Sequence, residues 1–242
     1  MSGIDENLPA HFPALAISDL LVLTLTVGTS MACIAPEIRD LLAVPVSEWA
    51  IPRWRGIVPE IADYMAIGVA LFGLIVLARQ RLRGSHHTTS PGHWIFIAIG
   101  PFMMLLLGMG LLRQFVSVEW TNRHLGWRSV RDGTIALVLA ISVLAVLPRV
   151  RSQVPRWRVC LLLILLFISI VAVIGVCDAA NVGGDYWLYL NNGAVLVFLA
   201  ALTAACVAIA IDVAQGVRRD WLHYCAIAML AIYAVSTATH YQ

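Results

Sequence analysis

The residue with the clearest chemical potential is Asp19, a carboxylate near the start of a long apolar segment. Thr26, Ser30 and Cys33 follow at spacings that place them on the same helix face. An ionisable group at bilayer depth costs free energy and is by default a functional candidate. One interpretation is a carboxylate that carries protons or cations. The other is an acid favoured by the helix dipole and hydrated at the membrane surface.

Asn191 and Asn192 form a second polar candidate, because they interrupt the beginning of another apolar segment. Amide groups at this depth either form hydrogen bonds between helices or ligate an ion through their carbonyl oxygens. We favour hydrogen bonding between helices. Ala200, Ala204 and Ala208 follow on one face of the same segment, and we expect this small-residue face to pack against protein.

Two further acids have simpler interpretations. Asp63 lies at the expected start of an apolar helix, where an acid favours the first turn. Asp212 lies at the end of another helix and is followed by Arg218 and Arg219, which predicts a local ion pair.

Histidines and cysteines give no candidate for catalysis, for a cofactor or for a metal ion. His223 and His240 lie at opposite ends of one segment and cannot bind one haem iron. A loose metal patch of His86, His87 and His93 is an alternative to a solvated loop, which we favour. The cysteines are scattered singly, although Cys33 and Cys177 would lie at the same membrane face.

The composition indicates what kind of structure positions these residues. Of the 242 residues, 60% are hydrophobic and 12% are charged, about half the charge of an ordinary soluble domain. Lipid must therefore contact much of the surface. The net charge of +2 gives no indication of nucleic-acid binding. All 16 basic residues are arginine, so the chain lacks the lysine that a retinal Schiff base requires.

We predict an all-α membrane protein, a bundle of about seven transmembrane helices forming a single domain over residues 1–242. The apolar stretches that meet or approach the length of about 20 residues needed to cross a membrane are 15–34, 62–82, 94–112, 133–147, 159–176, 188–211 and 221–239. All eight tryptophans lie in the connections or near segment ends, where indole rings prefer the headgroup region. We expect the first segment to be a retained helix.

The arginines indicate the orientation. Nine lie in short connections on the N-terminal side of the membrane and seven on the other side, which favours a cytoplasmic N-terminus. The first connection, residues 35–61, contains four prolines that exclude one long helix. An identical Pro-Arg-Trp-Arg sequence occurs at residues 52–55 and 155–158. An interfacial arginine-tryptophan anchor explains both copies, and an inverted repeat as in many transporters is the alternative.

Residues 17–24, Ile-Ser-Asp-Leu-Leu-Val-Leu-Thr, resemble the first-helix segment of uncharacterised multi-pass membrane proteins that are abundant in planctomycete-type bacteria. The resemblance implies a bacterial membrane location. It also implies that Asp19 belongs to a common segment feature, which favours a structural role.

Two functions are compatible with these observations. The first is a non-catalytic subunit or scaffold of a complex in the bacterial inner membrane, assembled with itself or with other membrane subunits. The second is a small ion-coupled transporter that uses Asp19 with Asn191 and Asn192. An enzyme is the third and least favoured hypothesis, and we expect no cofactor and no partner besides lipid and membrane proteins.

Overall fold

The computed structural model describes residues 17–42, 51–83, 90–115, 125–180, 182, 185–217 and 219–240. This part of the chain forms seven helices, and no strand occurs in it. The helices are α1 (Ile17–Leu42), α2 (Ile51–Leu82), α3 (Pro91–Phe115), α5 (Leu125–Val150), α6 (Pro155–Ala179), α7 (Tyr186–Ala214) and α8 (Trp221–His240).

Six of these helices, α1 to α7, are long and apolar enough to cross a membrane. The apolar part of α8, Trp221–Thr237, is shorter, and its length is at the lower limit for a transmembrane helix, about 17 residues. The prediction of an all-α bundle with about seven membrane helices is therefore confirmed for the described residues.

The main error in the predicted boundaries concerns the first connection. α1 continues through Pro36 to Leu42, and α2 begins at Ile51 with Pro59 in its interior. The prolines interrupt individual backbone hydrogen bonds without ending either helix. Helix boundaries predicted from the apolar segments alone are therefore too short. Asp63 consequently lies in the interior of α2, and the prediction that it occupies the first turn is wrong.

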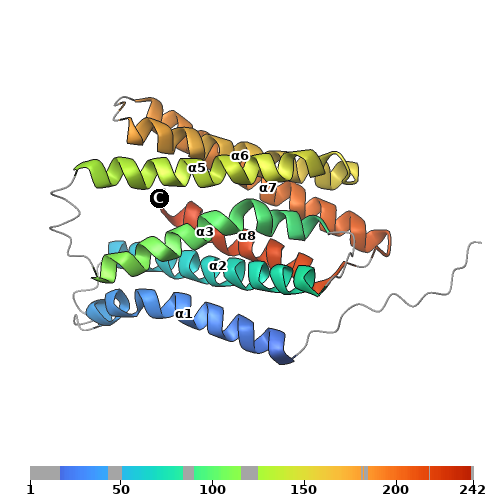
Figure 1. Cartoon of the computed structure of the whole chain (residues 1–242), viewed down its shortest axis with the longest axis horizontal. Helices are drawn as coiled ribbons and strands as arrows, with labels where there is room; N and C mark the ends of the chain where they lie inside the picture. Colours follow the sequence, from blue (N-terminus) through green and yellow to red (C-terminus); the bar gives the residue numbers. More distant parts are fainter. Residues whose placement is uncertain are drawn as a thin grey trace, which may run out of the picture.

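Successive helices run antiparallel and pack side by side (Figure 1). α2 contacts α1, α3 and α8, whereas α6 contacts α5 and α7. α3 connects these two groups because it contacts both α5 and α6, and α7 also touches α8. The core between them is closed by large side chains such as Phe72, Phe96 and Phe198.

This antiparallel order gives the bundle two distinct ends. We call the end where α1, α3, α6 and α8 begin the N-terminal end, and the opposite one, where α8 finishes, the C-terminal end (Figure 1). α2, α5 and α7 finish at the N-terminal end. Residues from the ends of seven helices therefore meet there although they are far apart in the sequence.

Candidate functional site

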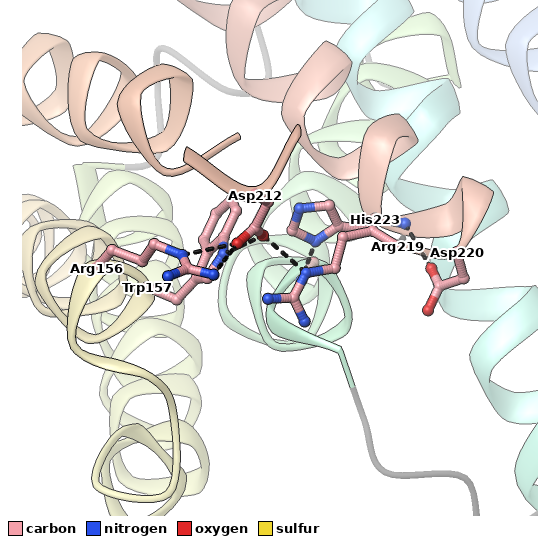
Figure 2. A network of polar contacts seen from close by, with 7 residues as sticks. Arg156, Trp157, Asp212, Arg219, Asp220 and His223 are labelled. Carbon is pink, nitrogen blue, oxygen red and sulfur yellow. Dashed lines mark hydrogen bonds and ion pairs between the residues drawn. The ribbon is translucent and has the colours of Figure 1, made fainter. Parts of the chain in front are cut away.

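The most elaborate polar site in the described chain surrounds Asp212, in the last turn of α7 at the N-terminal end. This carboxylate is 2% exposed. Arg156 Nε donates a hydrogen bond to Oδ1 at 2.7 Å, and its Nη2 forms an ion pair with the same oxygen. Trp157 Nε1 donates to Oδ2 at 2.9 Å, and Arg219 Nε donates to Oδ2 at 2.8 Å. Asp212 therefore joins α6, α7 and the segment before α8 (Figure 2).

Local backbone structure explains why these donors converge. α6 begins with Pro155, whose fixed φ angle suits the first helical position, so Arg156 and Trp157 lie in the first turn of α6. α7 ends at Ala214 and is followed by Gly216, whose φ angle is +66°. The N–H of Val217 donates to the carbonyl of Asp212 at 2.8 Å, the hydrogen bond of a Schellman ending. This turn reverses the chain and brings Arg219 back to Asp212.

His223 extends the polar site toward α3. Its Nδ1 accepts a hydrogen bond from the backbone N–H of Gly92 at 2.9 Å, so the ring is neutral and carries its proton on Nε2. The ring also packs edge to face against Trp157, with centroids 4.5 Å apart. A Cβ atom on Gly92 would lie only 2.5 Å from the Cα of His223. The close approach of α3 and α8 therefore requires glycine at position 92.

Asp220 completes the site at the beginning of α8. Its Oδ1 accepts a hydrogen bond from the N–H of His223 at 2.8 Å, the geometry of an N-cap. Its Oδ2 lies 3.3 Å from Nε2 of His93 in α3. Burial alone would raise the pKa of Asp220, but His93 and the N–H of His223 favour the carboxylate, and the pKa is below its usual value.

These residues form one connected group, which we call the Asp212 junction and which links α3, α6, α7 and α8. It consists of Gly92, His93, Arg156, Trp157, Asp212, Arg219, Asp220 and His223. Both oxygens of Asp212 accept hydrogen bonds from cationic or indole donors. Such a carboxylate is a poor general base, because a proton acceptor needs a free lone pair directed at its substrate. The geometry is that of a cross-link between helices.

Asp19, the first candidate from the sequence, lies at the same end of the bundle but in a separate pair. It is in the first turn of α1, and its Oδ1 lies 3.3 Å from Nη1 of Arg79 in the last turn of α2. The same nitrogen donates to the hydroxyl of Ser18 at 3.2 Å. Thr26 and Ser30 do lie buried on one side of α1, but their hydroxyls donate to carbonyls of their own helix.

Asn191 and Asn192 lie near the start of α7, at the C-terminal end and therefore far along the bundle from Asp19. Asn191 is half-buried and Asn192 is exposed. The alanine face that packs against protein also differs from the predicted one. Ala208 is buried and Ala204 is partly buried against the core, as expected, but Ala200 is exposed. The fully buried positions besides Ala208 are the neighbouring Ala201 and Ala205.

The ion pair predicted for Asp212 is confirmed for Arg219, whereas Arg218 lies outside the described residues. Sequence reasoning missed that His93 is buried in the first turn of α3 and lies close to α8. His86 and His87 lie outside the described residues. In the part of the chain that was described, no group of three or more metal-binding side chains occurs, and Cys33 and Cys177 are not joined by a disulfide bond.

No family model, no curated protein and no solved structure matches this chain.

Proposed function

We propose that this protein is a non-catalytic subunit or scaffold of a membrane complex. The observation that carries the proposal is the use of the charged groups at the N-terminal end. Three arginine–aspartate ion pairs and the contact between His93 and Asp220 connect separate helices or their flanking turns there. Charges paired in this way hold helix ends together. A transporter needs at least one of them to exchange its partner for a substrate ion.

The separation of the candidate residues supports the same proposal. Asp19, in the first turn of α1, is paired with Arg79 in the last turn of α2. Asn191 and Asn192 lie at the other end of the bundle. A single ion site built from all three residues would need their side chains within a few ångströms of the same cation, which helices of this length do not allow.

The outer faces of the bundle offer contact surface for lipid or for other subunits. On α5, Val130, Leu137, Ile141 and Leu144 are exposed at spacings that place them on one face. α1 and α7 expose similar apolar surface, including Leu25 and Leu196. We further propose a cytoplasmic N-terminus, since the positive-inside rule favours the arginine-rich N-terminal end on the cytoplasmic side. We propose a bacterial inner membrane because residues 17–24 resemble a segment of bacterial membrane proteins.

The test is to purify the full chain in a mild detergent and to determine the composition of the particle by native mass spectrometry. The proposal predicts a complex of fixed stoichiometry, formed with itself or with another membrane protein, that persists in Asp19→Asn. A monomer that transports ions after reconstitution into vesicles, and loses this transport in Asp19→Asn, would contradict it and would favour the carrier.

A further inference from the structure

Around Asp212, the Asp212 junction has more positive than negative charge, because Asp220 lies against His93 and the N–H of His223 instead. Asp212 contributes one carboxylate between two guanidinium groups, whose side chains are 22% and 19% exposed for Arg156 and Arg219. Arg219 uses only its Nε atom on Asp212. Its two terminal nitrogens point away from the carboxylate (Figure 2) and have no partner among the described residues. The junction therefore retains guanidinium N–H groups for another anion.

The surroundings strengthen this positive charge. The described residues at the N-terminal end include eight arginines and three aspartates. Besides Arg156 and Arg219, the arginines are Arg79, Arg81, Arg83, Arg149, Arg151 and Arg158, and the aspartates are Asp19, Asp212 and Asp220. Arg149 lies over the ring of Trp94, 5.9 Å from its centroid, rather than against a carboxylate. This end consequently attracts anions.

An apolar surface runs away from these guanidinium groups along the bundle. Val159, Leu162 and Leu166 on α6 are exposed at spacings that place them on one face, and Val213 is exposed beside Asp212 on α7. A phosphate group with attached acyl chains fits this combination of cations at a helix end and apolar side chains below them. A free phosphate ion would use only the cations.

We propose that Arg219 and Arg156 bind the phosphate of an anionic phospholipid at the Asp212 junction. The planar guanidinium group donates paired hydrogen bonds that match phosphate oxygens. Asp212 holds both arginines by their Nε atoms and so directs the remaining N–H groups. This inference is separate from the proposed subunit role, because a monomer could bind lipid in the same way.

The test uses the full-length protein in detergent, titrated with phosphatidylglycerol and, separately, with phosphatidylcholine, with bound lipid counted by native mass spectrometry. We expect one phosphatidylglycerol to bind in preference to phosphatidylcholine, and Arg219→Gln to weaken this binding about fivefold. Arg158→Gln is the matched control. Arg158 lies on the same membrane face, but donates to the carbonyls of Arg151 and Gln153, so this variant should change binding by less than about twofold.

If Arg219→Gln fails to fold, Arg219→Lys serves in its place, and it should weaken binding because an ammonium group lacks the planar pair of donors. Unchanged binding in the folded Arg219 variant, or an equal loss in Arg158→Gln, would overturn the proposal. Binding of inorganic phosphate through Arg219 that phosphatidylglycerol does not displace would also overturn it.

Discussion

The two ends of the bundle use charged residues differently. At the N-terminal end, Asp212 joins residues of α6, α7 and the segment before α8. At the C-terminal end, the buried Asp132 in α5 pairs with Arg131, its neighbour in the same helix, at 2.6 Å. A carboxylate that pairs within its helix contributes little to packing between helices, whereas one shared by three segments fixes their relative positions. Burial alone therefore does not distinguish a cross-link from a local pair.

Neutralising the two carboxylates gives the largest contrast. Asp212→Asn leaves two largely buried guanidinium groups without their anion, and we expect it to lower the free energy of unfolding by about 3 kcal/mol. Asp132→Asn leaves Arg131, which is 36% exposed, and should cost less than about 1 kcal/mol. Denaturant unfolding of the full chain in bicelles measures both values. Equal losses in the two variants would mean that the ends do not differ.

Glycine substitutions in α3 test the comparison through packing. In Gly92→Ala the added Cβ would meet the backbone of His223 at 2.5 Å, so we expect a loss of about 2 kcal/mol. Gly108→Ala is the control on the same helix, because its Cβ would have no atom within 4 Å. It should be neutral or should stabilise by up to about 1 kcal/mol. The comparison is made by the same unfolding measurement, and a tolerated Gly92→Ala would show that α3 and α8 are not closely packed.

Conservative replacement of tryptophan gives a smaller effect. Trp157→Phe removes a hydrogen bond to the carboxylate of Asp212 and should cost about 1.5 kcal/mol. Trp187 is at the C-terminal end and half exposed, so Trp187→Phe should change stability by less than about 0.5 kcal/mol. The melting temperatures in one detergent provide the measurement. A larger effect at Trp187 than at Trp157 would reverse the comparison.

The smallest effect is a pH dependence from Asp220. Its pKa in the folded protein is lower than the unfolded value of about 3.9. The associated stability is therefore complete above the unfolded pKa and is lost as the pH falls through the lower folded pKa. Asp220→Asn keeps an N-cap residue and removes the titrating group, so we expect its unfolding midpoint to fall less between pH 5 and pH 3, a range of about two units around that pKa. An equal fall of the unfolding midpoint with pH in the two proteins would exclude this contribution of Asp220.

The sequence predicts the apolar helices and part of the Asp212 junction. The order of the apolar helices follows from hydropathy, because lipid exposure requires long apolar segments. The pair of Asp212 and Arg219 was also predictable, since only seven positions separate them. The tetrapeptide at 155–158 indicates only an interfacial anchor. Trp157 is instead completely buried against Asp212.

The contact between Gly92 and His223 could not be predicted from one sequence. The two residues are 131 positions apart, and their contact depends on which helices become neighbours. Hydropathy specifies that a helix crosses the membrane but not which face meets which partner. The same limit explains the partial error in the alanine face of α7. Proline positions were equally ambiguous, because Pro36 and Pro59 lie inside helices, whereas Pro155 begins one.

A double-mutant cycle between Arg156 and Asp212 tests most directly whether the Asp212 junction stabilises the bundle as a cross-link. The free energy of unfolding in bicelles is measured for Arg156→Gln, for Asp212→Asn and for the double variant. We predict that the double variant is more stable than the sum of the single losses implies, with a coupling of at least about 1 kcal/mol. Losses that add to within about 0.3 kcal/mol would contradict the account.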